Sequence, residues 1–82
     1  MARFLVEAYT PGNAEIAEIE ARARRAADQL RNAGTDVQYL RAIFVPEDEL
    51  CLHLLDAESV EAANDLVRRA EISPDRIVNA EP

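Results

Sequence analysis

The spacing of apolar residues changes along the chain and predicts six elements of secondary structure. Apolar residues that recur three and four positions apart indicate helices, and runs rich in β-branched and aromatic residues between turn-forming residues indicate strands. The pattern predicts two helices, over residues 14–32 and 60–71. It predicts four strands, over residues 3–9, 37–45, 50–55 and 76–80. The predicted order is therefore β-α-β-β-α-β.

The first predicted helix has one apolar stripe and an ordered distribution of charge. Its first residues are rich in Glu, and Arg22, Arg24 and Arg25 form a solvated face towards its end. This order of charges counteracts the helix dipole and is therefore favourable. Asn13 can cap the first turn, and Gly34 stands where a left-handed residue commonly ends a helix. The stripe consists of Ile16, Ile19, Ala23, Ala26, Ala27 and Leu30.

The second half of the chain repeats the unit. A polar turn over residues 46–49 joins two strands, and Ser59 caps the second helix. The inner stripe of that helix consists of Ala63, Leu66, Val67 and Ala70. The repeated unit predicts an α+β ferredoxin-like domain over residues 1–82, with a four-stranded antiparallel sheet and both helices on one face.

The size of the chain favours oligomerisation. A domain of 82 residues buries only about 60% of the surface that its unfolded chain exposes. Cys51 is the only cysteine, so a disulfide framework is excluded and a structural zinc site is disfavoured. Association of two copies is the remaining common source of stability. We therefore predict a homodimer of the dimeric α/β-barrel type.

The charge of the chain disfavours two classes of partner. Sixteen acidic residues stand against nine basic ones, all of them Arg, which gives a formal net charge of −7. Such a surface repels the phosphates of nucleic acids and of anionic membranes. We expect no export signal and no transmembrane helix, since no apolar run approaches about 18 residues. With its single free cysteine, the chain is expected in the cytoplasm.

Only one face of the predicted sheet is covered by helices, so the strands must divide their side chains between two environments. Alternation assigns to the helix side Phe4, Val6, Ala8, Leu40, Ala42, Phe44, Leu50, Leu52 and Leu54. It assigns to the uncovered side Leu5, Glu7, Tyr9, Val37, Tyr39, Arg41, Ile43, Val45, Cys51, His53 and Leu55. So many apolar residues on an uncovered face indicate an interface between two copies or a binding groove.

The polar residues of that face form the predicted ligand-binding site. A mostly apolar pocket with a few convergent polar groups is typical of small-molecule sites. Glu7 and Arg41 either form an ion pair across the sheet or orient a polar ligand. Tyr9 and Tyr39 either line the pocket or are interface aromatics. The predicted site consists of Glu7, Tyr9, Tyr39, Arg41, Cys51 and His53.

His53 is the only histidine, and its role is open at this point. Its imidazole can act as a base or bind a metal, or it can be a packed side chain bonded to Glu7 or to a tyrosine hydroxyl. A metal needs several ligands, and a dimer would supply two imidazoles with Glu7 and Cys51 nearby. Cys51 lies on the same side of the strand as His53. It is either an activated thiol or an inert small apolar residue.

Short segments in a fixed order also carry a family resemblance. They are residues 4–7, 37–40, 45–48, 51–53, 56–62 and 74–77. In these segments the chain resembles a small bacterial ferredoxin-like domain family of mostly unknown function that includes a nickel-binding protein. The resemblance implies a ferredoxin-like fold, a dimer and a Ni(II) function. Ni(II) favours imidazole ligands.

Three functions remain open from the sequence. The first is a homodimeric protein that binds a transition metal such as Ni(II), or a small molecule, at the uncovered face. The second is a cofactor-free enzyme that uses the same face, by analogy with monooxygenases, isomerases and cyclases of the same fold. The third is an accessory module whose uncovered face is filled by the dimer.

Overall fold

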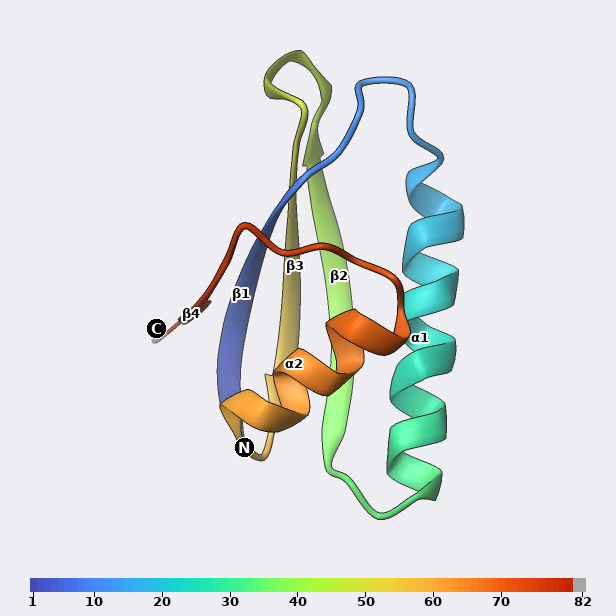
Figure 1. The fold of residues 1–82 in the computed structure, drawn as a ribbon, viewed down its shortest axis with the longest axis vertical. Coiled ribbons are helices and arrows are strands. Elements are labelled where there is room, and N and C mark those ends of the chain that lie inside the picture. The colour runs from blue at the N-terminus through green and yellow to red at the C-terminus, as the bar shows by residue number, and fades with distance from the viewer. Residues whose placement is uncertain (81–82) are drawn as a thin grey trace.

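The computed structural model describes residues 1–80 and has the predicted order of elements (Figure 1). Its helices are α1 (Ile16–Asn32) and α2 (Val60–Arg69), and a short 3-10 helix, η1, spans Pro46–Asp48. Its strands are β1 (Ala2–Tyr9), β2 (Val37–Val45), β3 (Leu50–Ala57) and β4 (Arg76–Asn79). Within these residues, neither helix is long and apolar enough to cross a bilayer.

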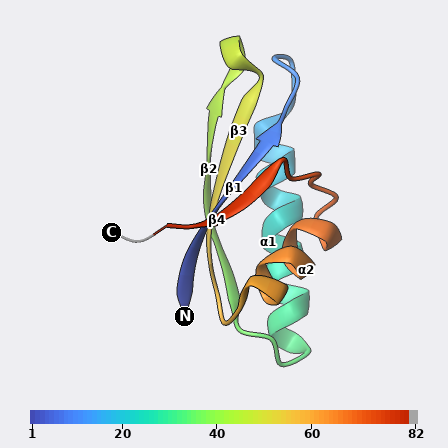
Figure 2. The ribbon, with the colours of Figure 1, turned by 60° about the vertical axis from the view of Figure 1, so that its left-hand side comes forward.

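The four strands form one antiparallel sheet in the order β2-β3-β1-β4. Both helices lie on the same side of this sheet and leave its other side uncovered (Figure 2). The small residues of the α1 stripe, such as Ala23 and Ala27, are buried and let the helix approach the strands closely. The predicted ferredoxin-like α+β fold is confirmed.

The ends of the helices show which capping predictions were right. Ser59 Oγ accepts a hydrogen bond from the backbone N–H of Ala62 at 3.1 Å, as predicted. Gly34 has a φ of +98°, which suits the residue that ends a helix. Asn13, however, does not cap α1. A turn in which Ala14 N–H donates to the Pro11 carbonyl delays the helix, which begins at Ile16 without a side-chain cap.

The predicted faces of β3 were wrong. Val6 and Ala8 of β1 face the helices, and the residues directly opposite them are His53 and Cys51. The side of β3 that is buried under the helices therefore carries Cys51, His53, Leu55 and Ala57. Leu50, Leu52 and Leu54 lie on the uncovered side. Leucines occur on both sides of this strand, so the alternation of side chains could not show which side faces the helices.

The first half of β2 was also assigned to the wrong face. Tyr39 pairs with Leu55 and Arg41 with Leu54, so Leu40 is an extra residue, a β-bulge. Before the bulge, Val37 and Tyr39 are buried on the helix side. After it the alternation predicted for Arg41, Ala42, Ile43, Phe44 and Val45 holds.

We call the uncovered side of the sheet the open face, and its centre is apolar. Leu5 lies between Leu54 and Val78 on the neighbouring strands, and Leu52 lies opposite Ile43. Ion pairs flank this centre, between Arg3 and Asp56 at 2.9 Å and between Glu7 and Arg76. The apolar residues of the open face are Leu5, Ile43, Val45, Leu50, Leu52, Leu54 and Val78.

Candidate functional site

The structure divides the six predicted site residues between the two sides of the sheet. Glu7, Tyr9 and Arg41 lie on the open face, whereas Tyr39, Cys51 and His53 lie on the helix side. The six side chains therefore do not line one common pocket within a chain, and of them only Tyr9 and His53 border the same cavity.

The residues left on the open face have other partners than those predicted. Glu7 forms its ion pair with Arg76 of β4 and not with Arg41. Tyr9 is 63% exposed. Among residues 1–80, no group of three His, Cys, Asp or Glu side chains lies close enough to hold a metal ion. The predicted ligand set of His53, Glu7 and Cys51 is therefore not assembled within one chain.

Tyr39 and His53 form a buried hydrogen-bonded pair on neighbouring strands. The hydroxyl of Tyr39 lies 2.7 Å from Nδ1 of His53. The two side chains are only 5% and 1% exposed, respectively. This bond matches the prediction that a tyrosine hydroxyl satisfies a packed His53.

Burial keeps both members of the pair uncharged. It lowers the pKa of His53 below its usual 6.5, against an opposing effect of the Glu20 carboxylate. Burial also raises the pKa of Tyr39, and here Glu20 acts in the same direction. At neutral pH the pair is thus a neutral imidazole and a neutral phenol.

The position of the protons in this pair follows from its partners. Among the described residues, His53 is the only group that bonds the Tyr39 hydroxyl. If Nδ1 carried the proton, the phenolic O–H would have no acceptor. We therefore assign the Tyr39 O–H as the donor to Nδ1, which leaves the imidazole proton on Nε2.

His53 is among the residues that line a cavity of about 300 Å³. No fully buried side-chain nitrogen or oxygen in the described chain lacks a hydrogen-bond partner, so the small exposure of His53 includes its unbonded Nε2. The cavity lies between the end of β1, the start of α1 and the segment after α2, which crosses from α1 towards β4 (Figure 1). Its apolar wall consists of Ala8, Pro11, Ala14, Ile19 and Ile72.

Polar side chains enter the same cavity from three segments. Nε of Arg22 donates to the Ala70 carbonyl at 2.6 Å, and its terminal nitrogens bond no other described residue. The Thr10 hydroxyl donates to the Ala8 carbonyl at 3.2 Å. Ser73 and Glu71 complete the polar lining with Tyr9 at its edge. We call this space the His53 cavity.

Sequence reasoning missed Thr10, Arg22 and Ile72 as parts of a site. Arg22 was interpreted as part of a solvated face, but it lies three residues after Ile19 and four before Ala26, beside the apolar stripe. That spacing was a usable signal, because a residue at the border of a stripe reaches the packed layer. No comparable signal marks Thr10 or Ile72, which lie in loops.

Cys51 is packed as a small apolar residue. It is fully buried, opposite Ala8 and Phe44. Burial raises the pKa of its thiol, and the Glu20 carboxylate adds to that effect. The thiolate that nucleophilic chemistry needs is therefore disfavoured.

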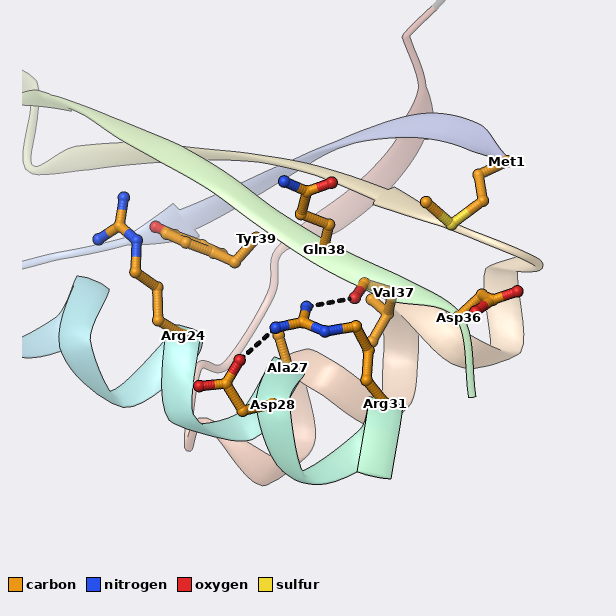
Figure 3. Close-up of a pocket in the computed structure, with 9 residues that line it drawn as sticks. All are labelled: Met1, Arg24, Ala27, Asp28, Arg31, Asp36, Val37, Gln38 and Tyr39. Carbon is orange, nitrogen blue, oxygen red and sulfur yellow. Dashed lines mark hydrogen bonds and ion pairs between the residues drawn. The ribbon is translucent and has the colours of Figure 1, made fainter. Parts of the chain in front are cut away.

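A second hollow of about 520 Å³ lies between α1 and β2 (Figure 3). Arg31 donates to the Val37 carbonyl at 2.8 Å and pairs with Asp28. Arg24 lies over the Tyr39 ring, 5.5 Å from its centroid, and donates to the Leu40 carbonyl at 3.2 Å. The guanidinium groups of Arg24 and Arg31 thus donate hydrogen bonds to carbonyls of β2, which protects this exposed strand edge. We assign this hollow a structural role.

Comparisons with known proteins agree with this architecture. The crystal structure of SCO4226 from Streptomyces coelicolor A3(2) matches with a TM-score of 0.75 at 20% identity, over 99% of this chain and 98% of that one. This likeness shows the fold. A comparison with curated proteins gave no match. The family described as "Nickel responsive protein SCO4226-like" matches residues 4–79. The chain therefore belongs to the SCO4226-like family, which confirms the resemblance seen in the sequence.

Proposed function

We propose that the protein is a homodimeric binding protein that holds a small organic molecule in the His53 cavity. The observation that carries this proposal is that His53 lines a cavity with mostly apolar walls while its Nε2–H bonds no described residue. A hydrogen-bond donor at the base of such a space needs an acceptor, which water or a ligand supplies. The Tyr39 hydroxyl fixes the ring that presents this donor.

The apolar centre of the open face supports the dimer. Leu5, Leu52 and Leu54 lie side by side on a surface that no helix covers. Packing this surface against a second copy would gain about 25 cal/mol for each Å² of apolar area removed from water. The ion pairs at its margins would remain at the rim, where charged groups are tolerated.

The chemistry of the cavity supports binding over catalysis. The lowered pKa of His53 makes it a weak base. Cys51 does not line the cavity, and the raised pKa of its thiol keeps it protonated. Together these groups favour a stable donor arrangement over proton or acyl transfer. A cofactor-free enzyme at the open face is not supported, because Tyr39, Cys51 and His53 lie on the other side of the sheet.

A second candidate function is the binding of Ni(II), which the family description favours. His53 Nε2 could ligate a metal if the proton moved to Nδ1 and the Nδ1–H donated to Tyr39. Two copies joined at their open faces would hold their His53 rings on opposite outer sides of the paired sheets. The two imidazoles could not then share one ion, so the remaining ligands would have to come from solvent or buffer.

Ligand-observed NMR with a panel of small acids, amides and alcohols tests the proposal. Ala14→Phe should fill the mouth of the cavity and abolish binding, because Ala14 lines it without belonging to the core. Ala21→Phe is the matched control, since Ala21 is exposed on α1. Binding that is absent from the wild type, or equal in both variants, would contradict a ligand site here.

Native mass spectrometry with and without Ni(II) separates the two candidates. A dimer that takes up no metal but retains NMR-detected ligands would support the organic ligand. One Ni(II) ion for each chain, lost in His53→Gln, would favour the second candidate. A monomer at micromolar concentration would contradict the proposed dimer.

A further inference from the structure

Two side chains of the His53 cavity, His53 and Arg22, have hydrogen-bond donors that no described residue accepts. Nε2–H of His53 is one donor, and the terminal NH₂ groups of Arg22 are others. The Thr10 hydroxyl already donates its proton to the Ala8 carbonyl. A ligand that satisfies this set must present acceptors, and two acceptors in one plane suit the fork of a guanidinium.

The charges around the cavity restrict the ligand further. Among the described residues that line it, Arg22 and Glu71 carry charge. Glu71 is exposed, and Glu20 uses its carboxylate to accept the Ala42 N–H on the β2 side. A single guanidinium, with Glu71 as the other charged residue of the lining, suits a monoanion better than a dianion. A dianion such as phosphate would meet stronger repulsion from Glu71.

The size and the apolar walls of the cavity indicate what the rest of the ligand is like. A volume of about 300 Å³ is at the lower end of the range for small-molecule pockets. Ile19 and Ile72 provide branched apolar surface opposite the polar groups. A compact aryl or branched aliphatic group would fill this part and exclude water.

We infer that the ligand is a small apolar monocarboxylic acid, bound with its carboxylate between Arg22 and Nε2–H of His53 and its apolar group against Ile19 and Ile72. This inference rests on the proposed function, since it names the class of molecule that the cavity holds. Arg22 is positioned for this task by its bond to the Ala70 carbonyl, which fixes one edge of the guanidinium and leaves the other for the ligand.

Isothermal titration calorimetry with paired ligands tests the inference. The panel contains benzoate and short branched-chain carboxylates, the primary amide of each, and inorganic phosphate. We expect carboxylates to bind more tightly than their amides and phosphate not to bind. Arg22→Gln should weaken carboxylate binding by about 10- to 100-fold, as expected for loss of a charged hydrogen bond. Arg22→Lys keeps the charge but not the forked guanidinium, so its affinity for carboxylates should lie between those of the wild type and Arg22→Gln.

The controls separate failure of the inference from failure of the proposed function. Arg25→Gln should bind like the wild type, because Arg25 is exposed on the same helix and lies outside the cavity. If amides bind as tightly as carboxylates, or if Arg22→Gln has no effect, the inference that the ligand is a carboxylate is wrong. The proposal that the cavity binds a ligand would still stand. Tight phosphate binding would overturn the choice of a monoanion. If no carboxylate or amide binds, the inference and the proposed function both fail.

Discussion

The Tyr39 hydroxyl lies 2.7 Å from Nδ1 of His53, and this bond joins β2 to β3 beneath α1. Tyr39 also borders the hollow beside α1, while His53 lines the cavity near the end of β1. The pair thus separates two hollows on the helix side of the sheet. Both side chains are buried, so each depends on the other for its hydrogen bond.

Tyr39→Phe should lower the free energy of unfolding by about 1–3 kcal/mol, because it leaves Nδ1 of a buried imidazole without a donor. Urea denaturation followed by circular dichroism measures this change. Tyr9→Phe is the matched control, since Tyr9 is 63% exposed and should change stability by less than about 0.5 kcal/mol. Equal stability of the two variants would contradict the structural importance of the pair.

The stability of the protein should fall as the pH drops below about 6.5. Burial lowers the pKa of His53 in the folded chain, so the unfolded chain takes up this proton first. The free energy of unfolding should therefore rise with pH, by at most about 1.4 kcal/mol for each pH unit. This dependence is confined to the interval between the pKa of His53 in the folded chain and 6.5.

His53→Gln should remove this dependence, which urea unfolding at several pH values can measure. The Arg3–Asp56 pair provides an internal reference. Arg3 lowers the pKa of Asp56, so the contribution of Asp56 is lost only in more acidic solution, as pH falls through values below 3.8. A wild-type profile that is flat between pH 5 and pH 7, or a slope that persists in His53→Gln, would contradict this assignment.

Leu52→Arg should convert the proposed dimer into a monomer. Leu52 lies at the centre of the open face, between Glu7 and Ile43 on the neighbouring strands, and a buried unpaired guanidinium is costly. Sedimentation velocity measures the change. Ala21→Arg on the outer side of α1 should remain dimeric. A dimer that persists in Leu52→Arg would show that another surface joins the two copies.

Glu20→Ala should expose one backbone amide at the edge of the sheet. Glu20 Oε2 accepts the N–H of Ala42 at 2.9 Å, on the outer side of β2. Without this acceptor, the Ala42 amide should exchange with deuterium at least about tenfold faster. Glu18→Ala serves as the control, because Glu18 is exposed on the same helix. Unchanged protection of Ala42 in Glu20→Ala would mean that α1 does not protect this edge.

The fold could be predicted because each element had its own local signal. The apolar stripe from Ile16 to Leu30 has a helical period, and Ser59 marks the start of the second helix. The faces of the strands had no such signal. Residues 50–55 are apolar on both sides, and only pairing with Val6 and Ala8 determines which side is buried. That pairing is a long-range contact and is not visible in local spacing.

The candidate site could be predicted only in part, for the same reason. His53 was identified as a candidate, and the alternative in which a tyrosine hydroxyl satisfies it proved correct. Its assignment to the open face was wrong because the two sides of β3 were exchanged in the prediction. The cavity depends on Thr10 and Ile72, which tertiary packing brings beside Arg22. Loops of this kind carry no periodic pattern that could reveal their neighbours.

The bulge at Leu40 also has a genetic consequence. If codon 40 were deleted, Tyr39 would be followed directly by Arg41, and the side chains from Val37 to Val45 would alternate without interruption between the two sides of the sheet. No side chain on either half of β2 would need to change sides. A single-codon deletion at this position should therefore be tolerated better than deletion of a neighbouring codon, although the strand would lose its local bend.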